Sequence, residues 1–111
     1  METKALHIIL DLWDCEYDIG DDDGLLKILI EAAEVSGSKV VGLATHRYEP
    51  YGFSAVVLVS ESHLSIHTWP EHNYVAIDIY TCGRTDPQAA AEYIIKKLKP
   101  SKISSSTIQR G

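Results

Sequence analysis

The order of hydrophobic and polar positions predicts two amphipathic helices among short strands. Residues 25–35 place leucine and alanine at positions i, i+1, i+4, i+7 and i+8, which gives a helix one apolar face. A second helix is expected from Asp86-Pro87 to about Leu98, because proline is favoured in the first turn of a helix. Strand-like segments lie at residues 6–13, 39–48, 53–60 and 73–81, and the tail at residues 101–108 is expected to add an edge strand.

This order of elements is typical of an α+β fold. We expect a two-layer α/β sandwich in which a largely antiparallel sheet carries two helices on one face. The 111 residues fit one domain, residues 1–111. No apolar run approaches the roughly 20 residues that a membrane-spanning helix needs, and the first residues lack the pattern of a secretory signal. We therefore expect a cytoplasmic protein without membrane contact.

Charge and cysteine content narrow the functional classes. Ten Lys and Arg against sixteen Asp and Glu give a net charge of −6. The chain has no basic stripe, so nucleic-acid binding is not expected. Cys15 and Cys82 are isolated in the sequence, and without an export signal they are expected to be reduced thiols.

Residues 61–72 carry the side chains that most strongly suggest chemistry. In an extended segment four of them share one face: Glu61, His63, Ser65 and His67. Three explanations are open on this segment alone: a solvated edge strand, a metal site formed by His63, His67 and His72, or a serine nucleophile with a histidine base. A typical zinc site has more carboxylate or thiolate ligands, and no G-x-S-x-G elbow surrounds any serine. We therefore expect no metal.

The same residues resemble a known family. The string ESHLSIHTWPE at residues 61–71, followed by IDIYTCG at residues 77–83, is similar to the prokaryotic S-adenosylmethionine decarboxylases. The resemblance extends to HRYEPYGFS at residues 46–54, to LWDC at residues 12–15 and to Asp86-Pro87, so it covers nearly the whole chain.

The resemblance implies that the chain cleaves itself to make a pyruvoyl group. In the family, the serine matching Ser62 attacks the carbonyl of the preceding residue, here Glu61, to give an ester. β-Elimination then leaves a dehydroalanine that hydrolyses to the pyruvoyl group. The products are residues 1–61 (the β chain) and residues 62–111 (the α chain). The family assigns the elimination base to the histidine matching His67, and the serine matching Ser54 supports processing.

The resemblance also implies the reaction. The substrate amine forms a Schiff base with the pyruvoyl carbonyl, which accepts the electrons left when carbon dioxide departs, so no metal or separate organic cofactor is needed. The cysteine matching Cys82 then protonates the product, and a thiol is largely protonated near neutral pH. The product supplies the aminopropyl group for spermidine synthesis, one step of polyamine biosynthesis.

Substrate contacts follow from the same resemblance. An aromatic residue at Tyr48 and the histidine at His67 sandwich the adenine ring, from opposite protomers of a homodimer with shared active sites. The acid at Glu71 binds the ribose hydroxyls, and Leu6 and His7 match positions near the pocket.

Two features leave alternatives open. Ser62 and His67 differ by five residues, so a regular strand places them on opposite faces unless the segment bends after Ser62 or the cleaved end turns back. Glu49 occupies a position that is commonly apolar in the family, and an extra carboxylate favours a cationic substrate. The alternative functions are therefore a pyruvoyl-dependent arginine or ornithine decarboxylase, and a ligand-binding regulatory subunit that never cleaves.

Overall fold

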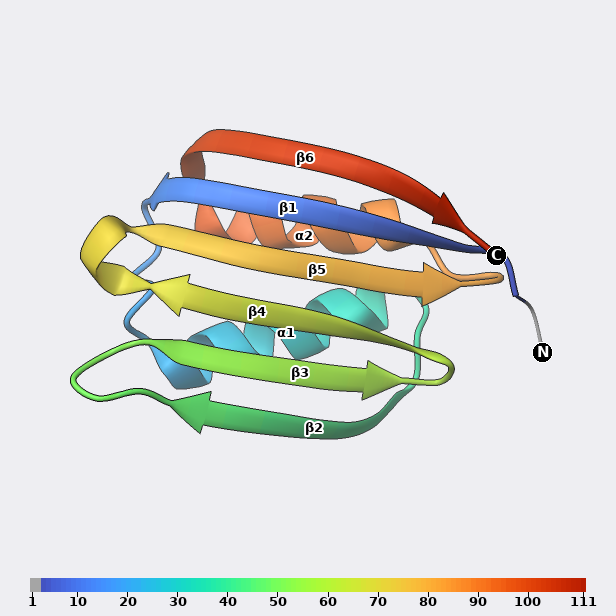
Figure 1. The fold of residues 1–111 in the computed structure, drawn as a ribbon, viewed down its shortest axis with the longest axis horizontal. Coiled ribbons are helices and arrows are strands. Elements are labelled where there is room, and N and C mark those ends of the chain that lie inside the picture. The colour runs from blue at the N-terminus through green and yellow to red at the C-terminus, as the bar shows by residue number, and fades with distance from the viewer. Residues whose placement is uncertain (1–2) are drawn as a thin grey trace.

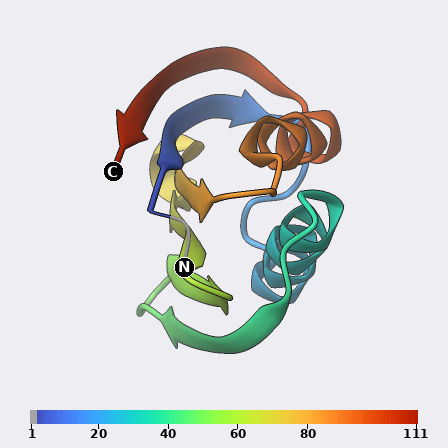
Figure 2. The same ribbon diagram turned by 90° about the vertical axis from the view of Figure 1, so that its right-hand side faces the viewer.

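A single six-stranded sheet forms the framework of the computed structural model, which describes residues 3–111. The elements are β1 (Ala5–Cys15), α1 (Asp22–Val35), β2 (Val40–Arg47), β3 (Phe53–Val59), β4 (Ser62–Trp69), a 3-10 turn (Pro70–His72), β5 (Tyr74–Cys82), α2 (Pro87–Leu98) and β6 (Pro100–Arg110). Every neighbouring pair in the order β2-β3-β4-β5-β1-β6 is antiparallel (Figure 1). Both helices lie on the same side of the sheet (Figure 2). The predicted two-layer α+β sandwich is confirmed.

Strict alternation along the central strands builds the core. Every second residue of β5 is buried, beginning with Val75 and including Ile77 and Ile79. These side chains form one cluster with apolar residues of both helices, such as Leu29 and Ile94. Each fully buried side chain of this kind contributes roughly 1.5–3 kcal/mol, so the sheet–helix interface supplies most of the driving force for folding.

Both helices begin at an aspartate cap. The side chain of Asp21 accepts a hydrogen bond from the Gly24 amide at 3.2 Å, and Asp86 accepts one from the Ala89 amide at 3.1 Å. An acceptor at this position satisfies amides that have no partner within the helix. The first helix therefore begins at Asp22, three residues before the apolar pattern predicted from residue 25.

The proposal of a solvated edge strand at residues 61–72 is wrong. β4 lies between β3 and β5, and the edges of the sheet are formed by β2 and β6. The second edge strand is the predicted tail, extended to Pro100–Arg110. Leu64 and Ile66 are buried under the helices, which explains why this segment is central despite its polar residues.

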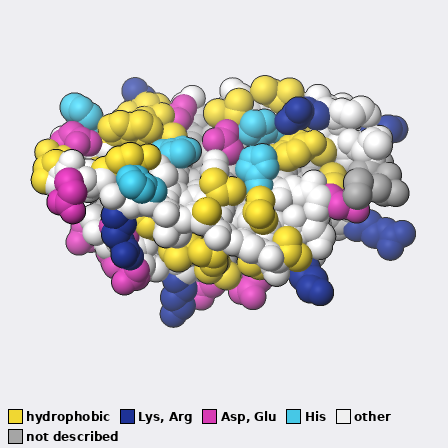
Figure 3. All heavy atoms as spheres, turned by 60° about the horizontal axis from the view of Figure 1, so that its bottom comes forward, with side chains coloured by type: hydrophobic (Ala, Val, Ile, Leu, Met, Phe, Trp, Pro, Cys, Tyr) yellow, Lys and Arg dark blue, Asp and Glu magenta, His cyan; other side chains and the backbone are white. Residues whose placement is uncertain are grey.

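The sheet surface that faces away from the helices, here called the open face, is mixed in character. Its central part is formed by alternate residues of four strands: His7, Ile9, Asp11 and Trp13; Ser54, Val56 and Leu58; His63, Ser65, His67 and Trp69; and Tyr74, Ala76, Asp78 and Tyr80. Histidine and hydrophobic side chains lie close together over this surface in Figure 3. Leu58 is 49% exposed and Trp69 is 42% exposed, so apolar side chains reach solvent near both ends of this face.

No helix within residues 3–111 has the length and apolar character needed to cross a bilayer.

Candidate active site

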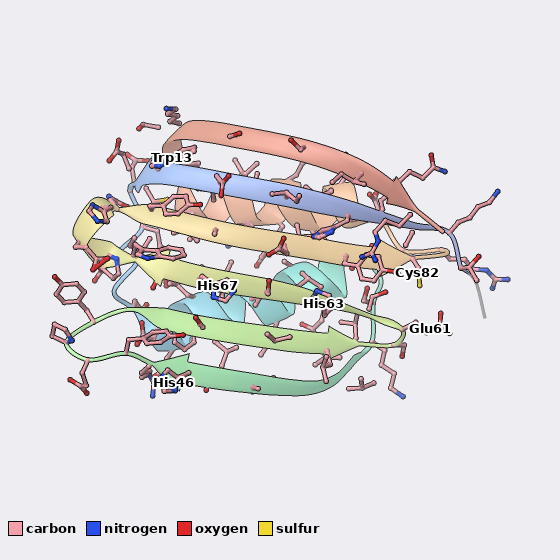
Figure 4. All side chains as sticks on the ribbon, viewed as in Figure 1. Trp13, His46, Glu61, His63, His67 and Cys82 are labelled. Carbon is pink, nitrogen blue, oxygen red and sulfur yellow. The ribbon has the colours of Figure 1, made fainter. Side chains whose placement is uncertain are left out.

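The turn between β3 and β4 places the predicted cleavage bond at one end of the sheet. Val59 pairs with Ser62, so the two residues between them form a short hairpin loop. Ser62 Oγ lies 3.5 Å from the Sγ of Cys82, the last residue of β5. That thiol lies 3.5 Å from Glu61 Oε2. A hydroxyl, a thiol and a carboxylate therefore meet beside the Glu61–Ser62 bond, at the right-hand end of the sheet in Figure 4.

Glu61 has a strained backbone. Its φ is 70°, in the left-handed region that glycine and asparagine usually occupy in two-residue hairpin loops. For an ordinary residue this conformation costs roughly 1–2 kcal/mol. The strain lies on the residue whose carbonyl precedes Ser62, so part of the folding energy is stored at the predicted cleavage bond.

Two cavities flank Cys82. One, of about 190 Å³, is also lined by Leu6, Thr81 and Gly83. The other, of about 650 Å³, is also lined by Glu61 and Arg84. Thr81 Oγ1 is buried and is the one such side-chain oxygen within residues 3–111 without a hydrogen-bond partner. Because an unpaired buried hydroxyl is costly, Thr81 offers a hydrogen bond to a group bound beside Cys82.

A second polar cluster lies at the opposite end of β3 and β4. Ser54 and His67 are direct partners across the two strands, and Ser54 Oγ lies 2.7 Å from His67 Nδ1. Tyr48 OH lies 3.3 Å from the same serine oxygen. The histidine ring is thereby held by a hydroxyl that is itself hydrogen-bonded, which fixes the orientation of the ring on the open face.

A cavity of about 400 Å³ adjoins this second cluster. Aromatic and polar side chains line it together: Tyr48, Tyr51, Ser54, His67, Trp69 and Glu71. Trp69 stacks on Tyr74 with 5.1 Å between ring centroids, so its ring is supported from behind. The arrangement suits a ligand with a flat ring and hydroxyl groups. Glu49 is exposed and does not line this cavity, so the carboxylate considered for a cationic substrate lies outside it.

Ser62 and His67 do not meet within one chain. β4 pairs with β3 and β5 without a register shift, so the bend considered after Ser62 is absent. Five residues of strand separate the two by about 16 Å, and their side chains point to opposite faces. His67 lies well along the strand from Glu61 in Figure 4. A base at His67 therefore does not reach Ser62 within the uncleaved chain.

Tyr48 and His67, in contrast, lie close together on the same chain. Both contact Ser54 Oγ, and both line the same cavity. The expectation that they sandwich the adenine ring from opposite protomers stays a prediction. The single chain shows that Tyr48, His67 and Glu71 line one cavity.

The sequence did not single out the network at the centre of the open face. Asp78 Oδ1 lies 3.0 Å from His7 Nε2, and Asp78 Oδ2 accepts a hydrogen bond from Ser65 Oγ at 3.1 Å. The signal was present, because the alternation in residues 73–81 already placed Asp78 opposite the buried residues. A neighbouring pair, Tyr74 OH and Asp11 Oδ1 at 2.6 Å, raises the pKa of Tyr74 to about 12, mainly through this hydrogen bond.

The other candidate residues from the sequence lie outside the two clusters described above. His63 packs against Tyr80 and His72 ends the 3-10 turn, and no three His, Cys, Asp or Glu side chains within residues 3–111 are grouped to hold a metal ion. Cys15 is a free, buried thiol. Burial, with a smaller contribution from the charge of Asp14, raises its pKa from 9.0 to about 11, so it is poorly suited to react.

The fold and its two clusters define a small α+β domain with a serine at a strained turn, a nearby thiol and a separate serine–histidine pair. A family model described as S-adenosylmethionine decarboxylase matches residues 6–111. A protein of Bacillus velezensis, "S-adenosylmethionine decarboxylase proenzyme", is 46% identical over 112 residues, covering 100% of this chain and 89% of its own length. One of Geobacillus sp. with the same name is 44% identical over 112 residues, covering 100% and 90%.

Solved structures agree with this match. The crystal structure of the adenosylmethionine decarboxylase from Aquifex aeolicus superposes with a TM-score of 0.88 at 34% identity, covering 100% of this chain and 93% of that one. A Trypanosoma brucei AdoMetDC monomer, with a TM-score of 0.59 at 17% identity, covers 93% of this chain and 44% of its own, and shares the fold. The chain belongs to the S-adenosylmethionine decarboxylase family.

Proposed function

We propose that this chain is a self-processing, pyruvoyl-dependent S-adenosylmethionine decarboxylase. The observation that carries the proposal is the contact between Ser62 and Cys82 beside the strained Glu61, at the position where the family resemblance predicts cleavage. The relatives are named proenzymes, which agrees with a chain that must be processed before it acts.

Processing begins with the Ser62 hydroxyl. Its oxygen attacks the Glu61 carbonyl carbon, so an ester replaces the peptide bond and the amino group of Ser62 becomes free. Removal of the Ser62 α-proton then expels the Glu61 carboxylate and leaves a dehydroalanine. Addition of water and loss of ammonia leave a pyruvoyl group at the start of residues 62–111. Relief of the left-handed Glu61 conformation favours the first step.

The surroundings of Ser62 fit the group that forms from it. Ser62 is half-buried beside the Cys82 thiol, and the unpaired Thr81 hydroxyl lines the same cavity as that thiol. Once formed, the pyruvoyl group supplies an electron sink for loss of carbon dioxide from an amino acid. Cys82 holds a proton beside this position and delivers it to the product carbon, which is the role of a positioned general acid.

The cavity beside Ser54 and His67 is assigned to the nucleoside part of the substrate. Tyr48 offers an aromatic face to the adenine ring and to the neighbouring sulfonium charge, and Glu71 offers a carboxylate to the ribose hydroxyls. No carboxylate other than Glu71 lines this cavity within residues 3–111, so a site for the guanidinium of arginine is less well supported.

The active form is a homodimer that shares its active sites. The open faces of two copies pack against each other, which covers Leu58 and Trp69 and places the His67 end of one copy against the Ser62 end of the other. Two sheets packed in this way lie about 10 Å apart, close enough for side chains from both to line one site. In this assembly the base missing beside Ser62 is the partner's His67. Leu6 lines the cavity beside Cys82 of its own chain.

Denaturing mass spectrometry of the purified protein tests processing. We expect two species, residues 1–61 and residues 62–111, the second carrying the pyruvoyl group. A single full-length chain of 12.3 kDa after prolonged incubation would support a regulatory subunit that never cleaves.

Carbon dioxide release tests the substrate. We expect release when the processed protein receives S-adenosylmethionine, and none with arginine or ornithine. Release with arginine or ornithine alone would keep the pyruvoyl chemistry and overturn the assignment of Tyr48 and Glu71.

A further inference from the structure

Asp78 is a charged residue at the centre of the open face. Its two carboxylate oxygens have different partners: His7 on β1 at 3.0 Å and Ser65 on β4 at 3.1 Å. The side chains of His7 and Asp78 are only 22% and 35% exposed in the single chain. Neither residue touches the Ser62–Cys82 contact or lines the cavity beside His67, so the chemistry described above leaves this network without a role.

The strand register places Asp78 in a straight row across the sheet. Ser65 is the partner of Asp78, Asp78 is the partner of Ile9, and Ile9 is the partner of Ser106 on the edge strand. These four residues therefore lie side by side at one level along the strands.

This row lies midway between the two ends of the active site. On β4, the midpoint between Ser62 and His67 falls between residues 64 and 65. On β5, Ala76 is the partner of His67, and the midpoint between Ala76 and Cys82 is residue 79, next to Asp78. In the proposed dimer the open faces pack together and the Ser62 end of each copy lies against the His67 end of the other. The two-fold axis then lies between the two sheets, perpendicular to the strands, at the level of this row. Residues close to the axis then face their own copies.

We propose that Asp78 lies at this two-fold axis and positions the two protomers in the register that assembles the shared active site. The proposal rests on the homodimer proposed above. Two carboxylates that approach each other away from water repel unless a positive group balances them. The row contains no other charge, and His7 is the partner that can supply the balance in each protomer. If the two protomers were shifted along the strands, each His7–Asp78 pair would lie away from the same pair in the second protomer or against apolar residues.

The proposal predicts that assembly depends on pH. With His7 protonated, each His7–Asp78 pair is neutral and the faces can join. Without that proton on His7, two negative charges face each other and the dimer weakens. The other charged or titratable side chains on the strands of this face are His46 on β2, His63 and His67 on β4, Tyr74, Tyr80 and Cys82 on β5, Asp11 on β1, and Lys102 and Arg110 on β6. Tyr48 and Glu71 line the cavity beside His67.

Comparison of Asp78→Asn with the parent chain isolates the pair from these other groups. We expect the dimer dissociation constant of the parent, measured by sedimentation equilibrium, to rise about tenfold or more from pH 6 to pH 8. In Asp78→Asn this rise is expected to disappear. Asp11→Asn, which removes a carboxylate from the same face away from the row, is the matched control and is expected to keep the rise. Equal pH profiles for the parent and Asp78→Asn would overturn the proposal.

Cross-linking tests the position of the axis without changing Asp78. In a chain with Cys15→Ser and Cys82→Ser, Ile9→Cys lies on the row, whereas Ala76→Cys lies two residues along the strand. The Ile9→Cys copies are expected about 10 Å apart, and the Ala76→Cys copies roughly 13 Å further offset along the sheets. A short bismaleimide is therefore expected to join only Ile9→Cys chains. Joining of Ala76→Cys instead would place the axis elsewhere and overturn the proposal.

The two proposals fail in distinguishable ways. A parent chain that is monomeric at every pH would overturn the shared active site and, with it, the role of Asp78. A parent dimer that cleaves normally but shows the same pH profile as Asp78→Asn would overturn only the role of Asp78.

Discussion

The two ends of β4 carry different parts of one proposed chemistry. At the first end, Ser62 lies at a strained turn beside Cys82, with groups that can attack, leave and donate a proton. At the other end, His67 is fixed by Ser54 beside an aromatic cavity, with groups that can accept a proton and bind a ring. Neither end has what the other supplies.

The difference supports the proposed homodimer, in which neither sheet completes an active site alone. A strand alternates its side chains between two faces, so residues five positions apart cannot meet within a regular strand. Ordinary strand geometry therefore separates the nucleophile from the base within one chain. We therefore expect a chain that has not assembled into the proposed homodimer to be unable to cut itself.

The largest expected effect is at the Ser62 end. Ser62→Ala removes the attacking hydroxyl, so cleavage is expected to be abolished and mass spectrometry to show only the intact chain. Ser60→Ala, in the same turn, is the control and is expected to cleave like the parent, because Ser60 is exposed and its backbone amide, which the substitution keeps, donates to the Lys39 carbonyl. Loss of cleavage in both variants would mean that the turn as a whole, rather than the Ser62 hydroxyl, is required.

Cys82→Ala is expected to separate turnover from processing. Removal of a general acid commonly costs 10²- to 10⁴-fold in rate, so we expect a loss of about that size in carbon dioxide release from processed protein. The extent of cleavage, measured on the same samples, is expected to fall much less. An equal loss of both activities would show that the thiol acts in cleavage as well.

Replacement of Glu61 tests the strain in the turn. In the uncleavable Ser62→Ala chain, Glu61→Gly is expected to be about 1 kcal/mol more stable than Glu61→Ala, because only glycine accepts the left-handed backbone without cost. Urea unfolding measures the difference. With Ser62 intact, Glu61→Gly is expected to cleave more slowly than Glu61→Ala; equal stability of the two variants would remove strain from the account.

The smallest expected effect is on stability at high pH and concerns Cys15, which lies at neither end of the proposed active site. Burial raises the pKa of Cys15 from 9.0 to about 11, so the folded chain keeps this proton at a pH at which the unfolded chain loses it. Its contribution to stability is complete below pH 9 and is lost as pH rises from 9 towards 11. At pH 10 the expected loss is about 1 kcal/mol. The unfolding free energy of Cys15→Ala is expected to fall less over this range, and parallel curves for the two proteins would contradict the assignment.

Much of the fold followed from local pattern. Proline after Asp86 and the apolar stripe from residue 25 identified the helices, and the alternation in residues 73–81 placed Asp78 and its neighbours on one face. The position of β4 in the middle of the sheet did not follow, because the exposure of one strand face looks the same in an edge strand and in a central strand with an uncovered side.

Only part of the candidate site could be predicted from the sequence. The resemblance supplied Ser62, His67 and Cys82, and the spacing already implied that the first two are apart. The hydrogen bonds of Asp78 and the unpaired hydroxyl of Thr81 depend on strand pairing between distant parts of the chain, which no short motif records. For the same reason the joint position of Tyr48 and His67 on one chain was missed.

Complementation between two inactive chains tests the shared active site most directly. Ser62→Ala lacks the nucleophile, and His67→Ala lacks the base, so neither is expected to cleave when expressed alone. When the two are co-expressed in equal amounts, a mixed dimer joins Ser62 of one chain to His67 of the other. We predict that about half of the His67→Ala chains are then cut into residues 1–61 and 62–111, as random pairing requires. Full-length His67→Ala chains in the presence of excess Ser62→Ala would contradict the account.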